Sequence, residues 1–269
     1  MDFREKLMVR PGHKVKLKDY DPDETFGFKK DNESEALTAK STARLDELQY
    51  ILYAENRRAL LIMLQAMDCG GKDGTIRHVM SGANPQGCKV TSFKVPSSEE
   101  AAHDFLWRYH KAVPARGEIG IFNRSPYEQV LVVRVHKLLP KREWSAAYEQ
   151  INMIERYLAE NDVTILKFFL HISKDEQKRR FQQRIDEPEK HWKLSPADFA
   201  ERQYWDDYIA AYEAALSRCS TKYAPWFIIP ANKKWFRNLA VSRIIAETLE
   251  SMNLKFPKPA IDLPKKVPE

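Results

Sequence analysis

Residues 59–77 of this 269-residue chain have the residue types and spacing of a phosphate-binding loop. An apolar run is followed by the turn Ala66-Met-Asp-Cys-Gly-Gly-Lys72 and by a segment that should begin a helix. Glycines allow backbone N–H groups to approach an anion, a helix N-terminus adds partial positive charge, and Lys72 adds a full charge. This layout predicts phosphoryl-transfer chemistry.

The loop matches the usual pattern G-x-x-x-x-G-K-[ST] only in part, because Ala66 replaces the first glycine and Asp73 replaces the hydroxyl residue. Glycine followed by lysine also occurs in plain surface turns. The apolar run before the loop, the helix expected after it and its concentration of glycines favour the functional interpretation. The predicted phosphate-binding residues of the loop are Gly70, Gly71, Lys72, Asp73, Gly74 and Thr75.

Asp68, inside the same loop, indicates a divalent cation. A carboxylate beside a bound polyanion is unfavourable unless a cation such as Mg²⁺ lies between them. Asp68 is therefore a candidate metal ligand. The alternative is an aspartate that only caps the turn.

A second group of polar residues follows the apolar run at 118–122. Asn123, Arg124 and Glu128 would lie at the carboxyl edge of a parallel sheet, where such sheets bind ligands. Asn123 could orient water around Mg²⁺, Arg124 could neutralise phosphate oxygens, and Glu128 could bind metal or orient the acceptor. The alternative is an ordinary helix start with Asn123 as its cap.

Two basic groups complete the predicted site. Arg179, Arg180 and Arg184 have the spacing of lid arginines that close over a transferred phosphoryl group. Lys94 and Arg108 follow another apolar run, in the usual position of an acceptor pocket. A charged run on a helix is more often a solvated face, so these assignments depend on the loop upstream.

Composition predicts a soluble, cytoplasmic protein. No stretch approaches about 20 uninterrupted apolar residues, and the first residues lack the apolar segment of a secretion signal. Cys69, Cys88 and Cys219 are too widely separated for a disulfide framework or a zinc site. The net charge of +6 suits a polyanionic partner but does not distinguish phosphate chains from nucleic acid or acidic lipid.

Apolar runs alternate with helical patterns, which is typical of a parallel α/β fold. Buried strands are expected at 59–65, 89–93, 118–122, 165–172 and 226–229. Long helices are expected at 140–161 and 195–217, and capping boxes at Ser97 and Ser173. The predicted fold is a parallel sheet of about five strands flanked by helices, with a helical lid.

We expect three parts along the chain. Residues 1–33 form an N-terminal extension on the surface, and regular structure begins near Ser34. Residues 34–255 form the phosphotransferase domain, whose lid spans about 174–200. Residues 256–269 form a C-terminal tail.

Taken together, these segments resemble the polyphosphate kinase 2 family over nearly the whole chain. The motifs that carry the resemblance are Gln65–Thr75, Asn84–Gly87, Thr91–Ser97, His103–Arg108, Phe122–Glu128, Lys167–Ser173 and Ala224–Trp226. Their order and spacing are specific. Many relatives have Asp at the position of Asn123, and Asn123 together with Glu128 is expected in the group that phosphorylates both AMP and ADP.

The resemblance implies a thymidylate-kinase-like P-loop core that transfers the terminal phosphoryl group of inorganic polyphosphate to nucleotides, reversibly and with Mg²⁺, or Mn²⁺ as an alternative. It places Asp68 and Lys72 in a Walker A loop and Asn123, Arg124 and Glu128 in a Walker B region, with Arg179, Arg180 and Arg184 in the lid. It also implies a homo-oligomer, a dimer or tetramer, without nucleic-acid or membrane partners. Cys69 and Pro126 are local departures from the family pattern.

Two other functions stay open at this point. An ATP-dependent nucleoside monophosphate kinase would share the fold and the lid. A non-catalytic polyanion-binding protein would share the positive charge, although carboxylates such as Asp68 and Glu128 would be unhelpful at its binding site.

Overall fold

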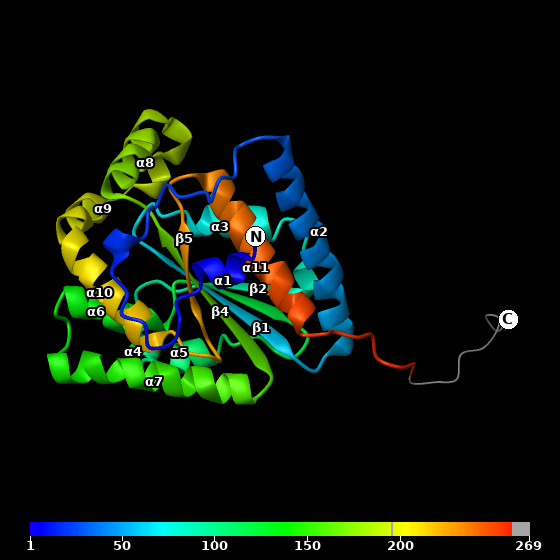
Figure 1. Ribbon diagram of the computed structural model, residues 1–269. Helices are drawn as coiled ribbons and strands as arrows, with labels where there is room; N and C mark the ends of the chain where they lie inside the picture. The colour runs from blue at the N-terminus through cyan, green and yellow to red at the C-terminus, as the bar shows by residue number, and fades with distance from the viewer. Residues whose placement is uncertain (195, 260–269) are drawn as a thin grey trace.

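The computed structural model of the protein describes residues 1–194 and 196–259, and a five-stranded parallel sheet forms its centre (Figure 1). The strands follow the order β2-β3-β1-β4-β5. Their bounds are β1 (Ala59–Ala66), β2 (Cys88–Ser92), β3 (Ile119–Asn123), β4 (Val163–His171) and β5 (Trp226–Pro230). The five predicted strands and the predicted fold class are therefore confirmed.

Helices lie on both faces of the sheet, as Figure 1 shows. On one side α2 (Asn32–Glu55) and α3 (Lys72–Val79) pack against α11 (Lys234–Ser251), and on the other α7 (Lys141–Glu160) packs against α10 (Trp205–Cys219). The shorter helices are α1 (Phe3–Leu7), α4 (Ser98–Ala101), α5 (Trp107–His110), α6 (Val132–Val135), α8 (Lys174–Asp186) and α9 (Pro196–Glu201).

Burial of the strands follows their place in the sheet. Every residue of β1 is buried, because β1 pairs with β3 and β4 and helices cover both of its faces. The expectation of a buried strand is wrong for β2. Lys89 and Val90 are exposed, because β2 is an edge strand that, within the described residues, pairs only with β3.

The N-terminal residues contribute to the core. Phe3 and Leu17 are buried in the same apolar cluster as the sheet, so the expectation of a segment that only covers the surface is wrong. Regular structure also begins earlier than Ser34, with α1 and with a cap at Asp31 whose carboxylate accepts a hydrogen bond from the Ser34 N–H. The three-part division stays a prediction, and residues 260–269 of the predicted tail lie outside the described residues.

The predicted capping box at Ser97 is confirmed, but only half of the box at Ser173 forms. Ser173 Oγ accepts a hydrogen bond from the N–H of Glu176, whose carboxylate instead binds Arg179 and Arg180. The carboxylate of Glu176 therefore binds two arginines and does not cap the N-terminus of α8.

The predicted helix at 140–161 is confirmed as α7, whereas the predicted long helix at 195–217 is interrupted. A 3₁₀ segment, Arg202–Tyr204, separates α9 from α10, and Ser195 lies outside the described residues. The interruption allows Trp205 to be buried and directs Arg202 towards α8, where it donates a hydrogen bond to Gln177 Oε1.

A fully buried ion pair joins α7 to β4. Lys167 Nζ lies 2.6 Å from Glu155 Oε2 and donates a hydrogen bond to the Cys219 carbonyl. The hydroxyl of Tyr127 accepts a hydrogen bond from Lys167 and donates one to Glu155. Burial lowers the pKa of the Lys167 ammonium and raises the pKa of the Glu155 carboxyl, because both charged forms lose hydration.

Removing one member of this ion pair should lower the free energy of unfolding much more than removing both members. We expect Lys167→Met to lower the free energy of unfolding by about 3–5 kcal/mol at pH 7, because Glu155 would stay buried without its counterion. Lys167→Met combined with Glu155→Leu should recover most of that loss. Denaturant titrations of the wild type and both variants measure the difference, and equal losses in the two variants would contradict the ion-pair account.

The same variants predict a pH dependence. Because the folded-state pKa of Glu155 is raised, its contribution to stability is lost as the pH rises through that pKa and is present at lower pH. Lys167 partly lowers this pKa, so Lys167→Met should raise it further, and the deficit in the free energy of unfolding relative to the wild type should be smaller at pH 5 than at pH 8. The double variant, which lacks the carboxyl, should not show this trend.

Candidate active site

The turn between β1 and α3 requires glycine at two positions. A Cβ atom at Gly70 would lie 2.3 Å from Ala66 Cβ, and one at Gly71 would lie 2.1 Å from Arg237 Nη1. Gly71 also has a φ of +99°, and Cys69 has a φ of +61°, in the left-handed region that residues with side chains rarely adopt. The backbone of the turn is therefore tightly constrained.

Hydrogen bonds hold four consecutive carbonyl groups of this turn. The carbonyl of Ala66 accepts from Lys72 Nζ, and that of Met67 accepts from the Gly70 N–H. The carbonyl of Asp68 accepts from Gln177 Nε2, and that of Cys69 accepts from Arg180 Nη1. The carbonyl oxygens are thus all engaged within the protein.

The N–H groups of the first turn of α3 lie beside a cavity. Helix geometry leaves these N–H groups without partners inside the helix, and the residues that carry them, Lys72, Asp73 and Gly74, line the cavity. Gly70 and Gly71 line it as well. Thr75 is buried instead, and its hydroxyl donates a hydrogen bond to the Gly71 carbonyl.

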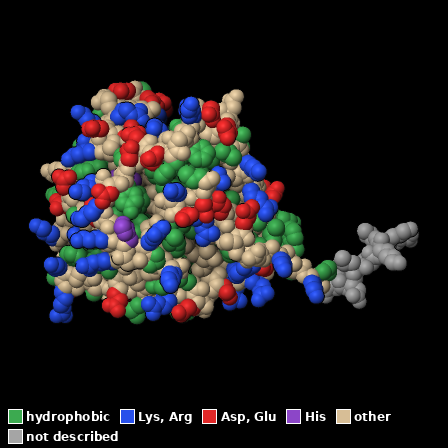
Figure 2. Space-filling model, in the orientation of Figure 1, with side chains coloured by type: hydrophobic (Ala, Val, Ile, Leu, Met, Phe, Trp, Pro, Cys, Tyr) green, Lys and Arg blue, Asp and Glu red, His purple; other side chains and the backbone are tan. Residues whose placement is uncertain are grey.

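This cavity, called here the basic cavity, has a volume of about 740 Å³ and is lined by ten lysine or arginine side chains and two aspartates. On the face of the molecule in Figure 2, lysine and arginine side chains lie among acidic ones rather than in one continuous basic surface. The basic cavity is therefore a local concentration of positive charge. Five of its cations were predicted from the sequence: Lys72, Lys94, Arg124, Arg180 and Arg184.

The other five cations of the basic cavity were missed from the sequence: Arg77, Lys190, Lys193, Lys234 and Arg237. Lys234 and Arg237 lie on α11, far along the chain from the loop, and belong to no motif. The available signal was the basic segment Lys233–Arg237, which follows the last strand and so begins at the carboxyl edge of the sheet.

Arg237 is 2% exposed, and its guanidinium donates hydrogen bonds only to the side chain of the neighbouring Asn238 among the described residues. Burial, together with the nearby Arg180, lowers the pKa of Arg237 to about 10. A buried cation without a counterion is unfavourable. An anion bound beside Gly71 would relieve this penalty.

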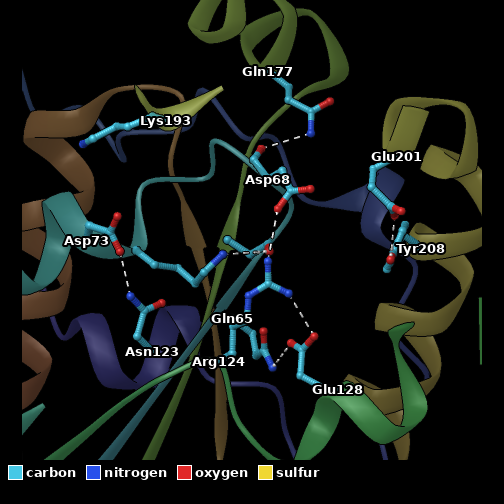
Figure 3. A network of polar contacts seen from close by, with 12 residues as sticks. Gln65, Asp68, Asp73, Asn123, Arg124, Glu128, Gln177, Lys193, Glu201 and Tyr208 are labelled. Carbon is cyan, nitrogen blue, oxygen red and sulfur yellow. Dashed lines mark hydrogen bonds and ion pairs between the residues drawn. The ribbon is translucent and has the colours of Figure 1, made fainter. Parts of the chain in front are cut away.

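Arg124 lines the basic cavity and lies between two carboxylates, as Figure 3 shows. Its Nη1 is 3.1 Å from Glu128 Oε2, and its Nη2 is 3.5 Å from Asp68 Oδ1. Gln65, a residue that the sequence did not predict for the site, donates a hydrogen bond to Glu128 Oε1. The nearby Glu128 and Asp68 carboxylates raise the pKa of Arg124, so this side chain stays cationic.

Arg124 also affects Lys72, and one further hydrogen bond holds Asn123. Burial and the nearby Arg124 lower the pKa of Lys72. Asn123 Nδ2 donates a hydrogen bond of 2.6 Å to Asp73 Oδ1, which joins the end of β3 to the first turn of α3 (Figure 3).

A second cavity of about 320 Å³, called here the acidic cavity, lies beside the basic one and shares Asp68 and Arg124 with it. It has apolar walls, acidic side chains and two tyrosines: Met67, Val95, Leu131, Val132, Glu128, Glu201, Tyr208 and Tyr212. Glu201 accepts a hydrogen bond from the Tyr208 hydroxyl and lies 3.0 Å from His136 Nε2. The two cavities therefore meet at Asp68 and Arg124.

Besides the buried Thr75, two predicted residues lie outside both cavities. The side chain of Arg179 is 60% exposed and paired with Glu176. Arg108 donates a hydrogen bond to the Lys94 carbonyl and pairs with Glu100, which places it behind the loop that carries Lys94. The catalytic role of Arg179 and the nucleotide-binding role of Arg108 stay predictions.

The carboxylates at the junction offer oxygen ligands but no complete metal cage. Among residues 1–194 and 196–259, no three His, Cys, Asp or Glu side chains gather in a group that could hold a metal ion. A hard cation could still be held by Asp68 and Glu128 if phosphate oxygens of a substrate completed its coordination.

The amino-acid sequence matches known proteins along most of its length. A model of the polyphosphate kinase 2 family matches residues 28–257. The AMP/ADP-polyphosphate phosphotransferase of Meiothermus ruber is 53% identical over 256 residues, which cover 94% of this chain and 96% of the relative. The ADP-polyphosphate phosphotransferase of Rhodopseudomonas palustris is 54% identical over 227 residues, which cover 80% of this chain and 78% of the relative.

A solved structure agrees with these relatives. The crystal structure of polyphosphate kinase 2 from Arthrobacter aurescens TC1 superposes with a TM-score of 0.93 at 45% identity, covering 98% of this chain and 94% of that one. The resemblance inferred from the sequence motifs is thus confirmed, together with a P-loop kinase-like fold. This chain belongs to the polyphosphate kinase 2 family.

Proposed function

We propose that the protein transfers the terminal phosphoryl group of inorganic polyphosphate to AMP and ADP. The observation that carries this proposal is the meeting of a basic and an acidic cavity at Asp68 and Arg124. The names of the relatives from Meiothermus ruber and Rhodopseudomonas palustris support the choice of donor and acceptors.

Polyphosphate is the ligand that best fits the basic cavity. Its repeating negative charge complements ten cations, of which six lie on α3, α8 and α11 and four lie on the segments that follow β2, β3 and α8. Lys72 and the N–H groups at the start of α3 bind phosphate oxygens near the point of transfer. Arg237 of α11 lies beside Gly71, Lys234 of the same helix lines the cavity, and both bind phosphates of the same polyphosphate chain.

The acidic cavity suits the nucleoside of the acceptor. Apolar walls and tyrosine rings provide surface for a base, and Glu201 and Tyr208 provide polar groups that can hydrogen-bond to it. An acceptor bound there would direct its phosphate towards Arg124, which faces both cavities. Asn123, predicted from the sequence to bind nucleotide, lies instead on the side of the basic cavity, against Asp73.

Positioning and charge neutralisation account for the proposed catalysis. Lys72 and Arg124 hold the transferred group and neutralise its oxygens, so that an acceptor phosphate oxygen attacks in line while shortened polyphosphate leaves. No covalent enzyme intermediate is needed. Because the two ends of this exchange are both phosphate chains, the same groups serve the reverse reaction.

Mg²⁺, or Mn²⁺ in its place, is the proposed cofactor, and the donor set fits it. Asp68 and Glu128 would hold the ion together with substrate phosphates, which suits the usual sharing of Mg²⁺ between carboxylates and phosphate. Asp68 is the freer ligand, since Glu128 already binds Gln65 and Arg124. The ion would supply positive charge that neutralises the phosphates as charge redistributes.

Other features of the proposal stay predictions. A homo-oligomer, a cytoplasmic location and the lack of a nucleic-acid partner follow from the family resemblance and the composition. In the part of the chain that the structure describes, we find no helix with the length and apolarity needed to cross a membrane.

The direct test of this function uses polyphosphate as the only phosphate donor. With Mg²⁺, polyphosphate and AMP, we expect ADP to appear first and ATP to follow, resolved by chromatography over time. Transfer from ATP to AMP but none from polyphosphate would assign the protein to the ATP-dependent kinases. Binding without any nucleotide product would instead support a polyanion-binding protein.

Lys72 should be essential for transfer. We expect Lys72→Ala to lower kcat/KM by at least about 100-fold, because a charged hydrogen-bond donor to the reacting phosphates is lost. The control is Lys40→Ala, which removes an exposed lysine of α2 away from both cavities. Near-normal turnover in a folded Lys72→Ala protein would contradict the assignment of the loop.

Variants on the two cavities should affect the two substrates differently. We expect Arg237→Met to raise the KM for polyphosphate by roughly tenfold and to leave the KM for ADP within about twofold, because a charged donor to phosphate is lost. Glu201→Gln should instead raise the KM for ADP and leave the KM for polyphosphate within about twofold. Initial rates with each substrate varied in turn measure both constants.

Arg237→Met should also stabilise the fold, because it removes a buried cation that lacks a carboxylate partner. A rise in the thermal unfolding midpoint, measured without substrate, checks this consequence. Equal effects of Arg237→Met on both substrates would contradict the division of donor and acceptor between the cavities.

A further inference from the structure

The peptide group between Asp68 and Cys69 lies at the junction of the two cavities, and α8 controls its orientation. The carbonyl of Asp68 accepts a hydrogen bond of 3.0 Å from Gln177 Nε2, shown in Figure 3. One helical turn further along α8, Arg180 binds the next carbonyl, that of Cys69. Cys69 is in the left-handed conformation, which the chain adopts rarely without outside support.

The contacts of Gln177 leave only one orientation for its amide. An arginine side chain can only donate hydrogen bonds, and a backbone carbonyl can only accept them. Gln177 is placed between Arg202 Nη1, 2.8 Å from its Oε1, and the carbonyl of Asp68. Its oxygen must face Arg202 and its nitrogen must face Asp68, so Arg202 determines which way the amide points.

Arg202 connects this contact to the acidic cavity. It begins the 3₁₀ segment after α9 and also donates a hydrogen bond to the Lys174 carbonyl at the start of α8. Its neighbour in sequence, Glu201, lines the acidic cavity and accepts a hydrogen bond from Tyr208. Gln177 and Asp68 line the same cavity, and a covalent and hydrogen-bonded path joins them to Glu201 through Arg202.

We propose that Gln177 and Arg202 are positioning residues for phosphoryl transfer. Arg202 orients the amide of Gln177, and Gln177 keeps the carbonyl of Asp68 turned away from the phosphate path. If this peptide rotated, the carbonyl oxygen of Asp68 would face the phosphates, and its negative partial charge would oppose their binding and alignment. The inference rests on the function proposed above.

The first test compares two arginine variants. Arg202→Met removes the donors but retains an unbranched side chain, and Arg156→Met removes an exposed arginine of α7 as a control. We expect Arg202→Met to lower kcat roughly tenfold while both KM values stay within about twofold, since the lost effect is on geometry rather than binding. Arg156→Met should match the wild type, and the two variants should share one unfolding midpoint.

A double-mutant cycle tests whether Arg202 acts through Gln177. In the background of Gln177→Met, adding Arg202→Met should change kcat by less than about twofold, because its target is already absent. A tenfold loss in both backgrounds would overturn the relay. Wild-type kcat in the single variant Arg202→Met would overturn it as well.

Hydrogen exchange provides a readout that does not need activity. We expect the amides of residues 67–71 to exchange faster in Arg202→Met than in Arg156→Met, because the backbone of the turn loses a support. Unchanged exchange would overturn the inference. If the wild type failed to use polyphosphate, the proposed function would fail, whereas the exchange rates would still decide the role of Arg202.

Discussion

Concentrated positive charge around one turn of the chain is the constraint on which the rest of this structure depends. Like charges in a partly dry cavity repel strongly, so each cation needs its own compensation. Arg124 is held between the carboxylates of Asp68 and Glu128, and Arg180 binds backbone carbonyls and Glu176. Arg237 hydrogen-bonds only to Asn238 among the described residues and has no carboxylate partner there. This is expected of a cation whose counterion is a polyanionic ligand.

The same constraint explains how the peptide groups of the turn are oriented. A loop that binds phosphate must direct N–H groups towards the ligand and carbonyl oxygens away from it. Here Lys72, Gln177 and Arg180 each take one carbonyl, and the Gly70 N–H takes another. The first two turns of α8 are therefore part of the scaffold of the loop. Arg180 and Arg184 of this helix already line the basic cavity, and the mobile lid expected from their sequence stays a prediction.

Parts of the site that depend on local sequence were predictable. The strand β1, the glycines of the turn and Lys72 are contiguous, and their pattern alone indicates a phosphate loop. The strand positions and α7 were predictable because apolar spacing reports burial directly. The exposure of β2 was not, since an edge strand and a central strand can carry similar residues. The interruption between α9 and α10 at Arg202 was also not predictable, because Arg202 contacts Gln177 of α8, which is distant in sequence.

The sequence by itself determined the family, the parallel α/β architecture and the residues of the loop, because motif spacing and hydrophobic periodicity are local properties of the chain. Only the tertiary structure decided which charges share a cavity. It brought Arg237 of α11 to Gly71, placed Gln65 within hydrogen-bond distance of Glu128, and set Arg179 outside the site. The physical reason is that electrostatic and hydrogen-bond partners depend on distance in space, which the packing of helices on the sheet determines and no single segment encodes.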